Sequence, residues 1–240
     1  MKLNESTAVS TNKVLLVPYD RRHVLTYHAW MEDPAIQQAT ASERLTLAEE
    51  YDNQLSWRAS HDKLTFIVCQ PSAPSTVVAA GEVDAPNKMV GDVNLFLTPY
   101  DDDNENSNDD SADRVSYVEG EVDIMIADAK HRGQGMGRAA VGAFLGYVAQ
   151  GGDTARHKQV VPKLRMLVAK INAGNGKSIA LFKSLGFEQE GDVNYFGEVK
   201  LVLRDDDNGN SLREKISVVG APEGYAEVVY TRSEGDTASL

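Results

Sequence analysis

A glycine-rich loop between a predicted strand and a predicted helix contains the residue types best suited to bind an anionic ligand. It spans residues 132–137, with glycine at positions 133, 135 and 137. Glycine lets the backbone turn tightly and approach a ligand without a Cβ in the way. Unpaired amides at the helix start, with the positive end of the helix dipole, favour an anion. The basic residues around the loop are Lys130, His131, Arg132 and Arg138. The segment therefore predicts a phosphate site, and a pyrophosphate is its natural occupant.

Two other phosphate motifs are excluded by single residues. The dinucleotide fingerprint G-x-G-x-x-G needs a third glycine where this chain has Arg138. The Walker loop G-x-x-x-x-G-K-[ST] matches at Gly176-Lys177-Ser178, but Ile171 occupies its first glycine position. These departures disfavour a nucleotide-binding α/β protein.

Two carboxylates on the strand before the loop are candidate acid–base groups. Alternation along a strand places Glu121, Asp123 and Met125 on one face. Repulsion between Glu121 and Asp123 can raise one carboxyl pKa towards neutrality. A solvated strand face is the alternative interpretation, and Asp92 on an earlier strand is a rival base.

The loop also matches the acetyl-CoA signature [QR]-x-x-G-x-[GA] as Arg132-x-x-Gly135-x-Gly137. This is the signature of the GCN5-related N-acetyltransferase (GNAT) superfamily. The stretch 175–187 resembles that family's downstream segment N-x-x-[AS]-x-x-[LV]-[YF]-x-x-x-G-F, and the order of elements over about residues 13–203 is similar. The strands KVLLVPY, MVGDVNLFL and GEVDIMIA look most like the eukaryotic N-acetyltransferase nine group.

The resemblance implies where acetyl-CoA binds. Two neighbouring strands splay apart and the pantetheine arm lies between them, against the backbone of Met125, Ile126 and Ala127. The residues implied at the pyrophosphate are Arg132, Gly133, Gln134, Gly135, Met136, Gly137 and Arg138. Asn175 would steady the pantetheine arm, with a plain turn or cap residue as the alternative, and Phe182 would pack against the thiol end.

The resemblance also implies direct attack of an amine on the thioester. Glu121 stands on the strand where relatives that use a base carry a glutamate. Many relatives place a tyrosine general acid where this chain has Phe182, which cannot donate a proton.

We therefore keep two hypotheses: an acetyl-CoA-dependent N-acetyltransferase for a primary amine of a protein or peptide, and a catalytically weak GNAT-like module that binds CoA or a protein. In this fold, acceptor specificity depends on the loop at about residues 34–45 and the hairpin at about 191–197.

The surrounding pattern predicts an α/β (α+β) fold. Predicted strands cover residues 13–19, 63–69, 90–97, 120–127 and 164–171, with one or two final strands within 192–203. Predicted helices cover 21–32, 46–60, 137–150 and 177–185. Thr46 and Glu49 fit a capping box at the start of the second helix, and Val141, Phe144, Leu145 and Val148 form a buried helical stripe. The resemblance implies a central mixed, mostly antiparallel sheet of six to seven strands with about four helices. We expect a GNAT domain over 1–204 with an acidic insertion at about 99–114. Residues 205–240 would be a tail, disordered or with one extra strand.

Net charge and composition indicate which classes of partner this protein can bind. The 240 residues hold 24 Lys and Arg against 36 Asp and Glu, a net charge of −12, which opposes nucleic acid and anionic membranes and favours a cationic amine. The single cysteine, Cys69, excludes an intrachain disulfide, and the histidines show no metal-ligand spacing. The sequence shows neither a secretory signal nor an apolar run of about 18 residues. We expect a cytoplasmic protein with acetyl-CoA and a protein or peptide amine as partners, and no nucleic acid, membrane or metal.

Overall fold

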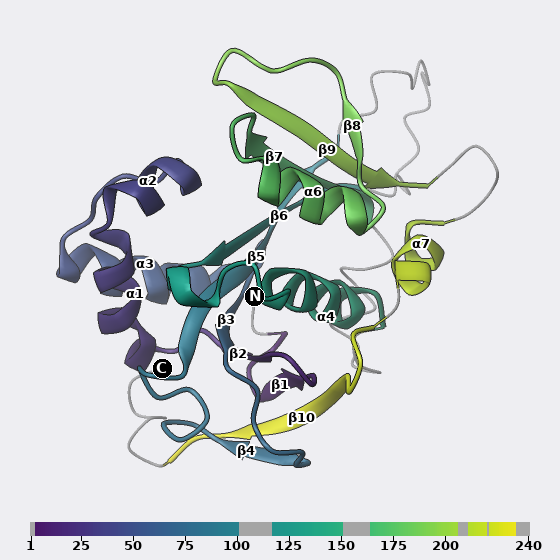
Figure 1. Cartoon of the computed structure of the whole chain (residues 1–240). Coiled ribbons are helices and arrows are strands. Elements are labelled where there is room, and N and C mark those ends of the chain that lie inside the picture. Colours follow the sequence, from purple (N-terminus) through teal and green to yellow (C-terminus); the bar gives the residue numbers. More distant parts are fainter. Residues whose placement is uncertain (1–2, 101–116, 151–163, 206–210, 220, 234–240) are drawn as a thin grey trace, which may run out of the picture.

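The computed structural model of the protein describes residues 3–100, 117–150, 164–205, 211–219 and 221–233. The predicted acidic insertion lies almost entirely outside these ranges. Figure 1 shows a central sheet with helices on both sides.

The described strands form one ten-stranded sheet. The strands are β1 (Thr7–Ser10), β2 (Leu15–Pro18), β3 (Lys63–Cys69), β4 (Val77–Ala79), β5 (Met89–Pro99), β6 (Val118–Ile126), β7 (Leu164–Asn172), β8 (Glu188–Glu190), β9 (Glu198–Arg204) and β10 (Ala226–Thr231). Their order is β4-β10-β1-β2-β3-β5-β6-β7-β9-β8. Only β10–β4 and β6–β7 pair in parallel, which confirms a mixed, mostly antiparallel sheet. The sheet has more strands than the six to seven expected. The sequence did not predict β1, β4 and β8, because they are only three or four residues long, and β10 comes from the expected tail.

The described residues form six α-helices, two more than expected. They are α1 (Val24–Met31), α2 (Pro34–Thr40), α3 (Leu47–Ala59), α4 (Met136–Gln150), α6 (Gly176–Ser184) and α7 (Leu212–Val219), with short 3-10 helices η1 (Arg21–His23) and η2 (Ala129–His131). The expected loop at 34–45 contains α2, because the Asp33 side chain caps it and Pro34 stands at its first turn. The predicted Thr46–Glu49 capping box begins α3. No helix within the described ranges is long and apolar enough to cross a membrane.

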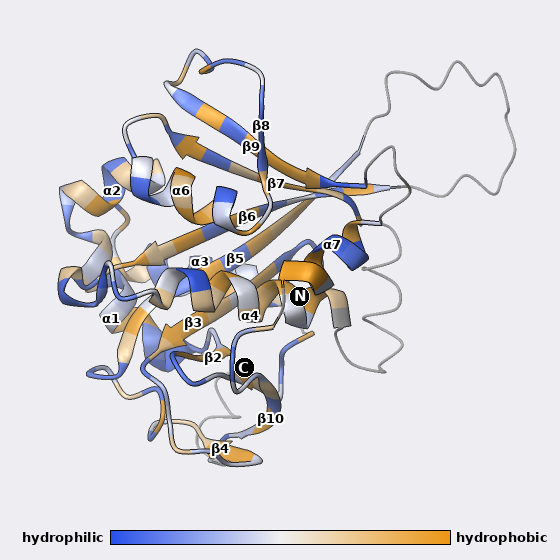
Figure 2. Ribbon diagram, turned by 45° about the vertical axis from the view of Figure 1, so that its right-hand side comes forward, coloured by the Kyte–Doolittle hydropathy of each residue, from blue (hydrophilic) through white to orange (hydrophobic). Residues whose placement is uncertain are grey.

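Two hydrophobic layers cover the two faces of the sheet. Helices α1–α3 lie on one side, and α4, α6 and α7 lie on the other (Figure 1). Hydrophobic residues recur along the central strands between these layers (Figure 2). The predicted stripe of α4 is buried throughout, and Phe66 of β3 meets the rings of Phe144 and Tyr147 edge-on at 6.0 and 5.3 Å. Burial of each such side chain contributes about 1.5–3 kcal/mol, so α4 is held firmly against the sheet.

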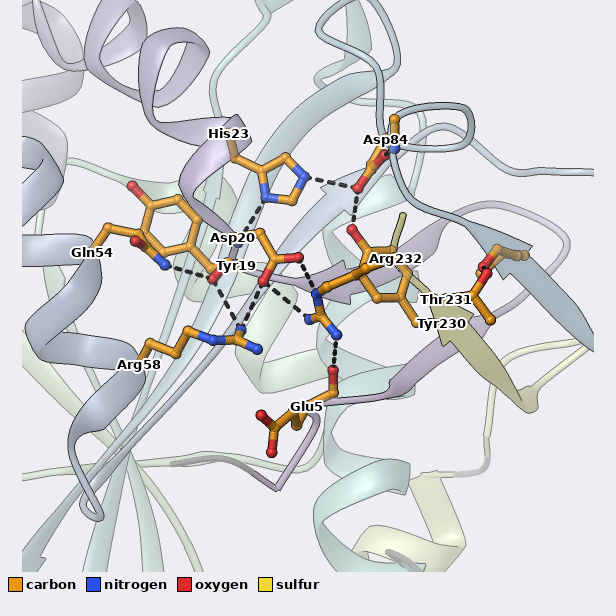
Figure 3. A network of polar contacts seen from close by, with 12 residues as sticks. Glu5, Tyr19, Asp20, His23, Gln54, Arg58, Asp84, Tyr230, Thr231 and Arg232 are labelled. Carbon is orange, nitrogen blue, oxygen red and sulfur yellow. Dashed lines mark hydrogen bonds and ion pairs between the residues drawn. The ribbon is translucent and has the colours of Figure 1, made fainter. Parts of the chain in front are cut away.

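A buried polar network joins the last strand to the first half of the chain (Figure 3). Asp20 accepts from Arg232 Nε at 2.7 Å and from Arg58 Nη1 at 2.8 Å. Next to them, Asp84 accepts hydrogen bonds from His23 and from the hydroxyl of Tyr230. Burial raises the pKa of Asp84, but the hydrogen bonds from His23 and Tyr230 outweigh it and bring that pKa to about 2. The expected tail thus supplies α7 and β10, and β10 lies between β1 and β4.

Candidate active site

The parallel strands β6 and β7 stay together for only part of their length. Their pairing ends at Glu121 and Val168. Beyond this point β6 continues to Ile126 alongside β5, and β7 continues to Asn172 alongside β9. The facing edges therefore part, and each keeps backbone groups that another extended chain can pair with. This is the splay that the family resemblance implies for a pantetheine arm.

A cavity of about 610 Å³ opens where the two strands part. Its floor is formed by β5, β6 and β7, and its sides by α1, α2, α3 and α6. Residues from both predicted acceptor loops line its mouth, Ala41 from one side and Phe196 from the other. The cavity is therefore accessible to an acceptor while it reaches the gap between the strands.

A cluster of polar side chains lies on the floor of this cavity. Strand register places Asn94 beside Asp123 and Asp92 beside Met125. Asp92 Oδ2 accepts from Asn94 Nδ2 at 2.7 Å and from the Tyr27 hydroxyl at 3.3 Å. Both Asp92 Oδ1 and Asn94 Oδ1 are buried without a hydrogen-bond partner in the described part of the chain. The floor therefore offers acceptor oxygens to a ligand that carries donors.

The two aspartates of the floor titrate near neutrality. Burial and the negative charges of Glu121 and Asp92 raise the pKa of Asp123 to about 7. Burial raises the pKa of Asp92 to about 6, against the effect of hydrogen bonds from Asn94 and Tyr27. Burial and the charge of Asp92 raise the pKa of Tyr27 well above its usual value, so its hydroxyl stays protonated. Asp123 is thus poised to take up and release a proton near pH 7.

The two predicted catalytic carboxylates have different partners. Glu121 Oε2 lies 2.7 Å from Lys170 Nζ of β7, and this contact raises the pKa of the lysine. Asp123 faces the same cavity without such an ion pair among the described residues. The negative charge of Glu121 is therefore balanced locally, whereas that of Asp123 is not.

The glycine loop has the irregular backbone that its sequence predicts. Gly133 and Gly135 have φ values of 75° and 79°, a region that favours glycine. Arg132 folds back on β6, where its Nε and Nη2 donate to the carbonyls of Ile126 and Ala127 at 2.7 and 2.8 Å. Since the Ala127 amide donates to the Val90 carbonyl, the end of β6 is fixed on both sides. Arg132 thus holds the loop against the strand.

The start of α4 presents free backbone donors. Among the described residues, no hydrogen bond engages the amides of Gly135, Met136, Gly137 and Arg138. Gln134 is exposed, with its Nε2 donating to the Lys130 carbonyl, and the Met136 side chain is buried in the core. A Cβ at Gly137 would lie 3.0 Å from Leu181 Cδ1, so this glycine lets α4 and α6 approach. Arg138 is exposed and donates to the Ser184 hydroxyl at 3.2 Å.

The two downstream residues lie on α6. Asn175 is its N-cap, with Oδ1 accepting from the Ser178 amide, and it also lines the 610 Å³ cavity. Phe182 lines the same cavity but is 98% buried, and its ring meets Phe187 edge-on at 5.1 Å. Asn175 therefore has the cap role that we held as an alternative. Phe182 contributes an apolar surface at the depth of the gap.

The sequence model of the acetyltransferase (GNAT) domain matches residues 13–188. The chain belongs to this family. An N-acetyltransferase 9-like protein of Schizosaccharomyces pombe is 41% identical over 220 residues, covering 85% of this chain and 98% of that protein. The human alpha/beta-tubulin-N-acetyltransferase 9 is 40% identical over 204 residues, covering 85% and 86%. These relationships confirm the predicted family and make the protein an acetyl-CoA-dependent N-acetyltransferase.

Solved structures of the GNAT fold agree with this architecture. A spermidine N-acetyltransferase from Vibrio cholerae in complex with CoA and spermine has a TM-score of 0.54 at 16% identity, covering 79% of this chain and 93% of that one. An aminoglycoside acetyltransferase in complex with coenzyme A has a TM-score of 0.52 at 15% identity, covering 82% and 94%. At this identity the likeness shows the fold.

Sequence reasoning on this GNAT domain missed three residues that line the cavity. Tyr27 comes from the first helix, Asn94 from β5 and Lys170 from β7, and only tertiary pairing joins them to Asp123. A usable signal was present, because Asp92 and Asn94 alternate on an otherwise apolar strand. Within the described residues, no group of three or more His, Cys, Asp and Glu side chains is arranged to hold a metal ion.

Proposed function

We propose that this protein transfers the acetyl group of acetyl-CoA to an amino group of a protein or peptide, with Asp123 as the general base. The observation that carries the proposal is a half-buried carboxyl, Asp123, with a pKa of about 7 in the cavity between β6 and β7. A base is most effective when its pKa lies near the working pH. Among the carboxylates of the floor, Asp123 combines this pKa with a position beside the strand gap.

The chain's own residues supply three parts of the reaction. Acetyl-CoA, when bound, brings an activated thioester. The free amides of α4 suit its pyrophosphate, and the parted edges of β6 and β7 suit its pantetheine arm. Asp123 takes the proton of the incoming ammonium, so that the neutral amine attacks the carbonyl carbon as the C–S bond breaks. Backbone amides near Ile126 polarise that carbonyl; loss of one such donor costs about 10²–10³ in rate in other enzymes.

As the amide forms, the attacking nitrogen loses its surplus proton to water, and the leaving thiolate obtains its proton from water in this proposal. Phe182 has no proton to give, and Tyr27 holds its proton tightly because its pKa lies well above the usual value. The deep, apolar position of Phe182 excludes solvent from one side of the gap.

The acceptor is a protein amine in this proposal. Tyr195 and Phe196, at the tip of the β8–β9 hairpin, are 97% and 78% exposed, and Phe196 lines the cavity mouth. Exposed aromatic side chains of this kind are frequent at protein interfaces. The names of the human and Drosophila melanogaster relatives specify α/β-tubulin as acceptor, and we extend that acceptor class to this chain.

A pH profile of thiol release tests the proposal, with purified α/β-tubulin as acceptor. We expect kcat/KM to rise with pH and to level off above about pH 7, because Asp123 acts when deprotonated. Asp123→Asn should lower kcat/KM by about 10²–10³. The surface variant Glu190→Gln is the matched control and should keep the wild-type profile. A wild-type rate in Asp123→Asn would refute the role of Asp123.

A second function rests on one observation, the replacement of the expected tyrosine by the buried Phe182. A GNAT module without an efficient acid could bind CoA or a protein and turn over slowly. Titration calorimetry with acetyl-CoA, run beside the thiol assay, separates the two functions. Binding of the thioester without thiol release from tubulin or a peptide library would favour the weak module.

A further inference from the structure

Strand β5 carries a row of side chains into the 610 Å³ cavity that the proposed acetyl transfer does not use. Asp92, Asn94 and Phe96 share one face of β5, because alternate residues of a strand point to the same side, and all three line the cavity. Tyr27 of α1 covers the row at Asp92, where its hydroxyl lies 3.3 Å from Oδ2. Trp57 of α3 covers the row at Phe96, where the two rings meet edge-on at 5.5 Å. These five residues form a pocket that we call the β5 subsite.

Two oxygens of the β5 subsite are buried without a hydrogen-bond donor. The exposed fractions of Asp92 and Asn94 are 2% and 5%. Asn94 Nδ2 donates to Asp92 Oδ2 at 2.7 Å. The Oδ1 atoms of both residues have no hydrogen-bond partner among the residues that the structure describes. A buried acceptor without a donor destabilises a folded protein, so the β5 subsite favours a ligand that brings N–H groups.

The charges that line the cavity favour a cationic ligand over a neutral one. The ionisable side chains in its lining, apart from the tyrosine, are Asp92, Glu121, Asp123, Glu198 and Lys170. The lysine is paired with Glu121. Within the described ranges Asp92 forms no ion pair, and both of its side-chain donors are neutral groups. A guanidinium or ammonium group supplies N–H donors and positive charge together, and the neighbouring aromatic rings attract such a cation.

The β5 subsite lies too far from the gap between β6 and β7 to hold the nitrogen that reacts. In the proposed mechanism that nitrogen lies at Asp123 of β6, beside the gap. Asn94 is the strand partner of Asp123, and neighbouring strands are about 4.8 Å apart. A group bound to Asp92 and Asn94 is therefore about one strand farther from the thioester than the reacting nitrogen.

We propose that the β5 subsite binds a second cationic group of the acceptor, the side chain of an arginine or lysine next to the residue that is acetylated. Asp92 Oδ1 and Asn94 Oδ1 accept hydrogen bonds from this group, and its aliphatic stem packs between Tyr27 and Trp57. This inference rests on the proposed function, since it needs transfer to a protein amine at Asp123. It makes Asp92 and Asn94 residues that determine acceptor specificity.

Thiol release from matched peptides tests the inference on the full chain. Two peptide pairs, one with a free α-amine and one with a lysine ε-amine as acceptor, carry either arginine or its neutral isostere citrulline beside the acceptor residue. In the pair that is acetylated, arginine should raise kcat/KM by about tenfold to a hundredfold, mainly through KM, because it adds charge-assisted hydrogen bonds to binding. Putrescine brings a second cation without a polypeptide, and its kcat/KM should be about tenfold below that of the arginine peptide.

Two variants that each remove one negative charge from the cavity locate the preference for arginine. Asp92→Asn should reduce it to about threefold or less, because the variant keeps the size of the side chain but not its charge. Glu198→Gln is the matched control, since Glu198 lines the same cavity from β9, across the gap from β5. This variant should keep the wild-type preference.

The comparison of arginine with citrulline in wild type needs no variant, and equal kcat/KM for the two overturns the inference. Full preference in Asp92→Asn also overturns it, as does an equal loss in Glu198→Gln, which would assign the effect to the net charge of the cavity. Equal turnover of putrescine would overturn a protein side chain as the source of the cation.

If no peptide releases thiol, titration calorimetry with the same peptides separates the two proposals. Tighter binding of the arginine peptide than of the citrulline peptide would support the β5 subsite while the proposed function fails. Equal binding of the two peptides would overturn the β5 subsite as well.

Discussion

The buried Asp20 network and the floor of the 610 Å³ cavity are both clusters of polar side chains, but their oxygens are satisfied differently. Both carboxylate oxygens of Asp20 accept from the guanidinium groups of Arg58 and Arg232. At the cavity floor, Asp92 Oδ1 is buried without a partner among the described residues, and burial raises the pKa of Asp92 to about 6. Positive partners favour the charged form of a buried carboxylate, whereas burial without them raises its pKa. The first arrangement stabilises the fold, and the second lowers its stability at the place where the proposed function needs an acid–base group.

The largest expected effect comes from breaking the paired cluster. Asp20→Asn should lower the free energy of unfolding by about 3–5 kcal/mol, because two buried guanidinium groups lose their counter-charge. Glu190→Gln is the matched control, since Glu190 also contacts two cations, Lys200 and Arg204, but at the surface. It should cost about 0–1 kcal/mol. Urea unfolding at pH 7.5 measures the loss of stability in both variants. Equal losses in Asp20→Asn and Glu190→Gln would contradict the difference between the buried and the surface cluster.

A smaller effect of opposite sign is expected at the cavity floor. Asp123→Asn should raise the free energy of unfolding at pH 8 by about 1–3 kcal/mol, because it removes a charge that burial disfavours. The folded pKa of about 7 lies above the unfolded value of about 3.9. The penalty in wild type therefore grows from about pH 4 to pH 7, and the advantage of the variant should disappear below pH 4. Thermal unfolding of wild type and variant from pH 4 to pH 8 measures this difference in stability. A variant less stable than wild type at pH 8 would contradict the prediction.

The smallest effects concern the tuning of Asp123 by its neighbours. The charge of Glu121 raises the pKa of Asp123 and the charge of Lys170 lowers it. Glu121→Gln should therefore move the midpoint of the kcat/KM profile to lower pH, and Lys170→Met should move it to higher pH, each by about half a unit. Shifts in the same direction in both variants would contradict this account. Glu198→Gln should act as Glu121→Gln does, but more weakly, since its effect on Asp123 is the smallest of the four charges.

The sequence predicted the parts of the site that depend on local chemistry. Glycines at 133 and 135 occupy left-handed positions, and the start of α4 has free amides, because these features depend on short-range backbone sterics. The alternation of β6 also placed Glu121 and Asp123 in one cavity. Such features can be read from a few consecutive residues.

The features that sequence reasoning did not predict depend on long-range pairing. The contact of Lys170 with Glu121 requires the register of β6 on β7, and the position of Tyr27 on Asp92 requires α1 to cover that face of the sheet. The short strands β1, β4 and β8 carry too few residues for a clear alternation. The extra strand expected within the tail at 205–240 had no predicted neighbour, and β10 pairs with β1 and β4.

The ion pair between Asp20 and Arg232 joins residues 212 positions apart in the sequence. During synthesis, the N-terminal portion emerges from the ribosome long before Arg232 exists. Until then, one edge of β1 has no companion strand and Asp20 has Arg58 alone as a counter-charge. The native fold of this enzyme therefore cannot be completed until residue 232 has been added, and the open edge of β1 can pair with other strands until then.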